Sequence, residues 1–255
     1  MSHFRRLSVR ALGDEAEPIR ARLLELVPAG LEEVVDGNAV ELAAYVPVAQ
    51  ADALLGEFPG AVVQPVPQGW EDAWRSFHHP VTVGGLWVGP PWDEAPDPAR
   101  AVVIDPGRAF GTGAHPTTRL CVELLATTAG RGSLLDVGCG SGVLAIAGVR
   151  LGFVPVVAVD VDPVAVETTV ANADANGVDV DVRLLDAEAA LLPPAGFAVA
   201  NVLLRPVEVI LGRLDADEAI TSGYLAGERP STEGWAHIEA VTLDGWAADR
   251  FRRLR

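Results

Sequence analysis

Lysine is absent from this chain of 255 residues, so all 19 of its basic residues are arginines. The P-loop of nucleotide-binding proteins requires a Gly-Lys-Ser/Thr sequence, and this chain is therefore not expected to contain one. No apolar run reaches the roughly 18 residues that would span a bilayer. No apolar stretch follows Met1–Arg6, so a signal peptide is not expected either.

Cysteine is also scarce. Cys121 and Cys139 are the two cysteines of the sequence, which is too few for a disulfide framework or for a cysteine-rich metal cluster. This usage fits a reducing compartment. We therefore expect a cytoplasmic protein that holds no metal.

Positive charge is in short supply as well, with 35 acidic residues against 19 arginines and a net charge of −16. Proteins that bind nucleic acids need a basic surface, so direct nucleic-acid binding is not expected. An acidic protein attracts and steers a basic partner. The alternative is that the charge serves general solubility.

Residues 1–66 are predicted to form a small domain of their own. Strand patterns occupy residues 4–11, 31–35, 39–46 and 61–66, and helix patterns occupy residues 15–27 and 48–58. The sequence Asp36-Gly37-Asn38 is typical of a hairpin turn. The order βαββαβ predicts a ferredoxin-like α+β fold, which by itself indicates only a module for binding or positioning.

Residues 67–100 hold four of the six tryptophans and many prolines. A flexible linker would be polar, so we expect a linker that packs on the residues after it, with a helix at Trp70–Phe77 and a strand at Leu86–Val88. The alternative is that Trp70 or Trp74 lines a substrate cleft.

Residues 101–255 alternate between strand and helix patterns. Strands are expected at residues 133–137, 156–160, 179–185, 195–202, 219–224, 238–243 and 246–252, and helices at residues 143–151, 165–176, 206–214 and from 117 onward. This alternation predicts an α/β fold, with a parallel sheet flanked by helices and an antiparallel end.

A glycine-rich turn follows the apolar run Leu134–Val137. Gly138, Gly140 and Gly142 would let backbone N–H groups approach a ligand at the start of the next helix. Their spacing is one residue short of the dinucleotide fingerprint, and Asp136 would repel a pyrophosphate. This acid suits a cationic ligand instead, such as the amino group and sulfonium of S-adenosylmethionine.

A second acid, Asp160, ends the apolar run that begins at Val156. In nucleotide-binding α/β folds, an acid at the tip of the second strand accepts hydrogen bonds from the ribose hydroxyls. The alternative is that the glycines form only a tight turn and that Asp160 caps the helix begun by Asp162 and Pro163.

The most unusual segment runs from Phe110 to Thr118 and reads Phe-Gly-Thr-Gly-Ala-His-Pro-Thr-Thr. A loop with a threonine helix cap would explain Pro116 and Thr117. It would not explain the first four residues together with His115.

This segment resembles the F-G-T-G-x-H-x-T-T motif of the methyltransferase family that modifies bacterial ribosomal protein L11, the PrmA family. The resemblance covers most of residues 70–225, through Trp70-x-x-x-Trp74, Gly89–Trp92, Asp136–Gly142, Asp160–Pro163 and Ala200–Leu203. It implies a class I S-adenosylmethionine-dependent N-methyltransferase with a seven-stranded, mostly parallel Rossmann-like sheet in residues 101–255. The implied substrate amines are the α-amine and lysine side chains of ribosomal protein L11, recruited by the N-terminal domain.

The resemblance also implies site residues. The positions that would contact the cofactor are Thr118, Gly138, Asp160 and Asn201, and Gly140 and Gly142 belong to the same glycine turn as Gly138. Asp136 would lie near the amino group of the cofactor and Asp186 near its adenine. Phe110 and His115 would lie over its reacting end. Asn201 can accept a hydrogen bond from the substrate amine, or else cap the helix after it. Either His115 or solvent would take the proton of the amine.

Two stretches depart from the family's pattern. Asp215–Glu218 stands where the family has a Pro-Gly-Gly-type turn, and the helix after the fifth strand is predicted to shrink to about Arg229–Trp235. Two alternatives therefore stay open: the same chemistry on another protein or a small amine, and a non-catalytic S-adenosylmethionine-binding protein associated with the ribosome. We expect a monomer.

Overall fold

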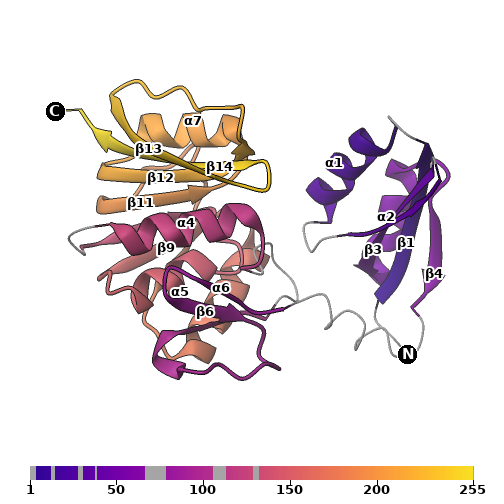
Figure 1. Ribbon diagram of the computed structural model, residues 1–255, viewed down its shortest axis with the longest axis horizontal. Helices are drawn as coiled ribbons and strands as arrows, with labels where there is room; N and C mark the ends of the chain where they lie inside the picture. Colours follow the sequence, from indigo (N-terminus) through magenta and orange to yellow (C-terminus); the bar gives the residue numbers. More distant parts are fainter. Residues whose placement is uncertain are drawn as a thin grey trace. The chain divides into compact units, whose positions relative to one another are not determined.

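The computed structural model describes residues 4–12, 15–27, 31–37, 39–66, 79–105, 113–128 and 132–254. The chain divides into two compact units, Met1–Phe77 and His78–Arg255, and Figure 1 shows the elements of each. Among the helices of the described residues, none combines the length and the apolar character needed to cross a membrane.

The first unit is a four-stranded sheet with two helices. Its elements are β1 (Phe4–Leu12), α1 (Ala16–Leu26), β2 (Glu32–Asp36), β3 (Ala39–Pro47), α2 (Val48–Glu57) and β4 (Val62–Pro65). The strands lie in the order β2-β3-β1-β4, and every pair is antiparallel. This is the split βαβ arrangement, so the predicted ferredoxin-like fold is confirmed.

The second unit contains a small three-stranded sheet. Its strands are β5 (Val81–Val83), β6 (Leu86–Gly89) and β7 (Ala101–Val103), with the short 3₁₀ helix η2 (Pro98–Arg100) before β7. β6 pairs antiparallel with β5 and parallel with β7. The strand expected at Leu86–Val88 is therefore β6. The helix expected at Trp70–Phe77 lies outside the described residues.

The second unit also contains a seven-stranded sheet. The strands are β8 (Leu134–Val137), β9 (Val156–Asp160), β10 (Asp181–Leu184), β11 (Ala195–Asn201), β12 (Ala216–Leu225), β13 (Trp235–Leu243) and β14 (Trp246–Arg253). Their order is β10-β9-β8-β11-β12-β14-β13. The first five of these are parallel, and β14 is antiparallel to both of its neighbours. The predicted Rossmann-like sheet with an antiparallel end is confirmed.

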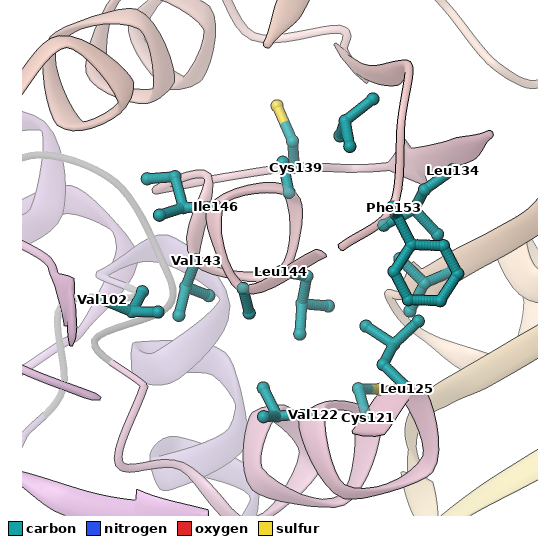
Figure 2. Close-up of a cluster of buried hydrophobic side chains, with 14 of the residues drawn as sticks. Val102, Cys121, Val122, Leu125, Leu134, Cys139, Val143, Leu144, Ile146 and Phe153 are labelled. Atoms are coloured by element: carbon teal, nitrogen blue, oxygen red, sulfur yellow. The ribbon is translucent and has the colours of Figure 1, made fainter. Parts of the chain in front are cut away.

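Helices cover this sheet on both faces (Figure 1). The helices are α4 (Pro116–Thr127), α5 (Val143–Arg150), α6 (Pro163–Asn176) and α7 (Leu204–Arg213). Figure 2 shows the core on the first face, where Leu144 and Ile146 of α5 join Val122 and Leu125 of α4. The core on the other face includes Ile210 of α7. Because both faces of β8 are buried, its residues read as an apolar run rather than an alternating one.

Two expectations near β12 differ from the structure. The helix expected at about Arg229–Trp235 does not form: residues 226–234 are a turn and irregular chain, and Trp235 begins β13. Nine residues that include Pro230 leave no room for a stable helix with its two connections. The strand expected at residues 219–224 begins three residues earlier, because β12 starts at Ala216 and pairs there with β11.

Candidate active site

Several of the predicted site residues lie at the carboxyl edge of the parallel strands. The glycine turn follows β8, Asp160 ends β9 and Asn201 ends β11. Parallel strands that follow one another in such a sheet end at the same edge, which is where ligands bind in open α/β folds. The topology therefore brings three segments that are distant in sequence to one edge of the sheet.

The glycine turn joins β8 to α5. Gly138, Gly140 and Gly142 have positive φ angles of 74°, 54° and 81°. A Cβ atom at Gly138 would lie 2.5 Å from Cγ1 of Val202, and one at Gly142 would lie 2.8 Å from Cγ2 of Thr169. Glycine is thus required both by the left-handed backbone and by the closeness of the neighbouring side chains.

Asp136 lies on β8 beside this turn, with 1% of its surface exposed. Its Oδ2 accepts a hydrogen bond from the N–H of Ala145 at 3.0 Å, whereas its buried Oδ1 has no hydrogen-bond partner among the described residues. Burial is the main cause that raises the pKa of this carboxyl to about 7, and the charge of Asp160 adds to it. A buried carboxylate oxygen without a partner is costly. A cationic group would remove that cost, so the site fits the ammonium of S-adenosylmethionine.

Asp160 is half-buried at the end of β9. Its Oδ2 accepts a hydrogen bond from the N–H of Gly140 at 2.9 Å, and its Oδ1 accepts one from the N–H of Asp162 at 3.0 Å. These two bonds fix the carboxylate against the glycine turn. The N-cap of α6 is Asp162, whose side chain accepts from the N–H of Val164. The cap is therefore Asp162, and Asp160 is not needed for that purpose.

Asn201 is the last residue of β11, and its side chain is held from α4. Its Nδ2 donates to the hydroxyl oxygen of the buried Thr118 at 3.4 Å. This contact orients the amide so that Oδ1 remains as the acceptor. The helix α7 begins at Leu204 with Leu203 as its N-cap. The alternative in which Asn201 caps that helix is therefore excluded.

Gly223 supports the backbone next to Asn201, a contribution that the sequence analysis missed. Its φ angle is 103°, and a Cβ atom there would lie 2.1 Å from the carbonyl oxygen of Val202. The N–H of Val202 donates to the carbonyl of Ser222 at 3.1 Å. An isolated glycine inside a strand pattern is the one signal that could have identified this close approach.

His115 is the N-cap of α4, in place of the threonine cap considered from the sequence. Its Nδ1 lies 2.8 Å from the hydroxyl oxygen of Thr117 and accepts from the N–H of the same residue at 3.4 Å. The ring also meets Trp246 edge to face, with centroids 5.0 Å apart. Burial lowers the pKa of His115, which favours the neutral imidazole that can accept a proton.

Two predicted residues contribute less to the described geometry. Asp186 is exposed two residues after β10, and its Oδ1 accepts from the N–H of Glu188 within a turn. The preceding N–H, of Leu185, donates to the carbonyl of Asp160 at 2.8 Å, so both acids lie at one edge. Phe110 falls within residues 106–112, outside the described part of the chain.

The strand order, the glycine turn, the acid within β8 and the acid that ends β9 define the Rossmann-like class of methyltransferase folds. A solved structure of this class supports the assignment: the ribosomal protein L11 methylase from Lactobacillus delbrueckii subsp. bulgaricus matches with a TM-score of 0.60 at 25% identity. The match covers 67% of this chain and 95% of the other.

The family model for ribosomal protein L11 methyltransferase (PrmA) matches residues 36–252. The chain belongs to this family. It is 46% identical over 172 residues to the ribosomal protein L11 methyltransferase of Dechloromonas aromatica (strain RCB), covering 64% of this chain and 56% of the relative. Identity to the protein of the same name from Symbiobacterium thermophilum is 40% over 194 residues, covering 70% and 64%. The chain thus spans less than two thirds of the length of these relatives.

Proposed function

We propose that this chain is an S-adenosylmethionine-dependent N-methyltransferase that methylates the α-amine and lysine ε-amines of ribosomal protein L11. The observation that carries the proposal is Asp136, a buried carboxyl with one oxygen lacking a partner among the described residues, beside a glycine turn. The names of the family and of the relatives support the choice of substrate.

When bound, S-adenosylmethionine supplies a methyl group on a sulfonium, which an amine can displace in line. Asp136 would pair with the ammonium of the cofactor, and Asp160 would accept hydrogen bonds from the ribose hydroxyls. The turn that contains Gly138, Gly140 and Gly142 would contact the cofactor. Thr118 of α4 and Asn201 of β11 would also contact it, and Asp186 would lie toward the adenine. By the family resemblance, Phe110 would lie over the reacting end.

Asn201 would align the substrate. Because its Nδ2 donates to Thr118, its Oδ1 can accept a hydrogen bond from the amine and direct the nitrogen lone pair toward the methyl group. Alignment of this kind is the main contribution that an enzyme makes to a displacement at carbon. The amine must be neutral, and burial in a cleft lowers the pKa of a lysine.

The proton of the amine leaves to solvent or to His115. The imidazole of His115 is held by Thr117 and Trp246, and its lowered pKa keeps it neutral at physiological pH. A neutral ring is able to act as a general base, and to take the proton at Nδ1 it would have to release the N–H of Thr117.

The substrate would be attracted by charge. The chain carries a net charge of −16, and an acidic protein steers a basic one toward it. Residues 1–66 would recruit ribosomal protein L11, and the protein would act as a cytoplasmic monomer. Deletion of residues 1–66 tests the first of these statements, because methylation that survives the deletion unchanged would contradict it.

A second candidate function is the same chemistry on another protein or a small amine. The irregular connection at residues 226–234, which lacks the expected helix, favours this alternative because it alters the surface after β12.

Mass spectrometry of ribosomal protein L11 after incubation with this chain and S-adenosylmethionine distinguishes the candidates. The proposal predicts mass gains of one methylene per methyl group, greatly reduced in an Asn201→Ala variant that still binds the cofactor. Cofactor binding without any mass gain would contradict the L11 substrate and favour the second candidate. Binding without turnover on any amine would favour the non-catalytic alternative.

A further inference from the structure

The buried face of α6 carries a stripe of polar side chains where apolar ones would be expected. Thr169, Asn172 and Asn176 are 0%, 4% and 9% exposed and lie on one side of the helix. A buried amide or hydroxyl costs free energy unless it is hydrogen-bonded. Each of the three forms at least one hydrogen bond to a residue outside α6.

Asn172 joins two segments that lie far apart in the sequence. Its Nδ2 donates to the carbonyl of Ser141 in the glycine turn at 2.8 Å, and its Oδ1 accepts from the N–H of Asp105 at 3.3 Å. Asp105 follows β7 and directly precedes residues 106–112. One amide thus fixes the distance between the glycine turn and the chain leaving β7.

The neighbouring stripe residues have different partners. Thr169 donates to the carbonyl of Gly140 at 3.0 Å, so it also contacts the turn. Asn176 accepts from the N–H of Val103 at 2.8 Å and donates to the carbonyl of the same residue at 2.7 Å. Its Nδ2 also donates to the carbonyl of Asn172 at 2.7 Å. Asn176 therefore holds β7 against α6 without touching the glycine turn, although it has the same side chain on the same helix.

These contacts determine the orientation of the turn peptides. In a trans peptide the carbonyl and the following N–H point in opposite directions. The carbonyls of Gly140 and Ser141 are drawn toward α6, so the N–H groups of Ser141 and Gly142 point away from that helix. The N–H of Gly142 closes the turn by donating to the carbonyl of Cys139 at 2.8 Å. A network of fully bonded buried polar groups holds such an arrangement rigid.

We propose that Asn172 is a positioning residue for cofactor binding, which sets the glycine turn by bonding Ser141 and Asp105 at the same time. The inference rests on the proposed function, since the ligand of the turn is the proposed cofactor. A turn that is fixed in its binding conformation loses less conformational freedom when the ligand arrives, and this raises affinity.

The test compares Asn172→Asp with Asn176→Asp in the whole chain, using S-adenosylmethionine as the titrant in calorimetry and thermal melting as the measure of folding. Asn172→Asp keeps an acceptor for Asp105 but sets a carboxylate oxygen against the carbonyl of Ser141. We expect its dissociation constant to rise about tenfold, and that of Asn176→Asp to stay within about twofold of the unaltered chain. Both variants bury one new acid, so their melting temperatures should fall together.

A second, neutral pair keeps the test decisive if the acidic variants do not fold. Asn172→Ala and Asn176→Ala should show the same order of dissociation constants at similar melting temperatures. Equal weakening by both positions, or unchanged binding by the Asn172 variants, would overturn the inference and leave the proposed function intact. Failure of the unaltered chain to bind S-adenosylmethionine would overturn the proposed function, and this positioning role with it.

Discussion

Two aspartates of the seven-stranded sheet are equally buried and differ in their partners. Asp136 on β8 and Asp249 on β14 each expose 1% of their surface. Asp249 uses both oxygens: Oδ1 lies 2.6 Å from Nε2 of His237, and Oδ2 accepts from the hydroxyl of Tyr224 at 2.9 Å. Asp136 has one bonded oxygen and one without a partner among the described residues.

The difference separates a carboxylate that stabilises the fold from one that is suited to a ligand. Asp249 links three adjacent strands, because Tyr224 lies on β12 and His237 on β13. The hydroxyl of Thr221, 2.7 Å from that of Tyr224, extends the cluster. Full bonding lets a buried polar group specify the packing, whereas partial bonding leaves a cost that a ligand can remove. Hydrogen-bond partners, rather than burial, thus distinguish the aspartate that stabilises the fold from the one suited to a ligand.

The largest effect is expected from Asp249→Ala. The substitution leaves the hydroxyl of Tyr224 and the ring of His237 without their shared acceptor, and the loss of two such hydrogen bonds costs about 2–4 kcal/mol of unfolding free energy. Urea unfolding measures this loss. In conditions where the variant is folded, its dissociation constant for S-adenosylmethionine should equal that of the unaltered chain. A selective loss of cofactor affinity would break the comparison, because Asp249 would then serve the ligand.

Asp136→Asn should remove a dependence of stability on pH. The folded pKa of about 7 lies above the ordinary value of 3.8, so between these values the folded chain binds more protons than the unfolded one. The free energy by which protonated Asp136 favours the folded chain is therefore fully present below about pH 4, and it is lost as the pH rises through about 7. From pH 5 to pH 8 the loss is on the order of 3 kcal/mol in the unaltered chain, and it should vanish in the variant.

Urea titrations of both proteins at the two pH values measure this difference, and parallel pH profiles would contradict it. The affinity of the unaltered chain for S-adenosylmethionine should change in the opposite direction. It should increase as the pH rises through about 7, because the ionised carboxylate is the form that pairs with an ammonium.

Gly223→Ala tests whether the cluster around Asp249 and the proposed site are independent. Gly223 lies on β12 between that cluster and the backbone beside Asn201. The new Cβ atom would meet the carbonyl of Val202 at a residue whose φ is 103°. We expect a loss of about 2 kcal/mol in stability and a fall in kcat that exceeds the change in cofactor affinity. Gly212→Ala on α7 is the matched control, because its Cβ would meet nothing within 4 Å.

The smallest effect is expected from Tyr224→Phe. The ring stays in place, and the hydroxyl that bonds Asp249 and Thr221 is lost. Removing one partner of a buried hydrogen bond costs about 1–2 kcal/mol. Thermal melting and urea unfolding measure the loss, and methylation per folded molecule should not change. A pronounced loss of turnover would show that the Asp249 cluster extends its influence to the site.

Much of the fold was predictable because it depends on local patterns. The βαββαβ order of the first unit followed from alternating runs and from the hairpin at Asp36-Gly37-Asn38, and the Rossmann-like sheet followed from apolar runs bounded by glycine and acid. The glycine turn and Asp160 were identifiable because their spacing is fixed by a strand, a turn and a helix. The roles predicted for the site residues stay predictions, and so do the domain limits.

The features that sequence reasoning missed depend on contacts between distant segments. In the sequence, Asn172 looks like an ordinary polar residue of a helix. Nothing in the residues around it indicates that its side chain bonds to Ser141 and Asp105. The cap of α4 was misassigned because histidine is an uncommon N-cap, and its geometry is visible only in space. The connection at residues 226–234 was misread because a shortened helix and an irregular loop have similar compositions.

The position of β14 has a consequence for the order of assembly. β14 lies between β12 and β13 in the sheet but follows both in the chain. β13 has β14 as its neighbour in the sheet and cannot join before residues 246–253 are available. During synthesis, β12 therefore remains an open edge, with unpaired backbone groups that can recruit another strand. Only in this late step does β12, the strand next to Asn201, gain its second neighbour in the sheet. In the same step Asp249 meets its hydrogen-bond partners Tyr224 and His237.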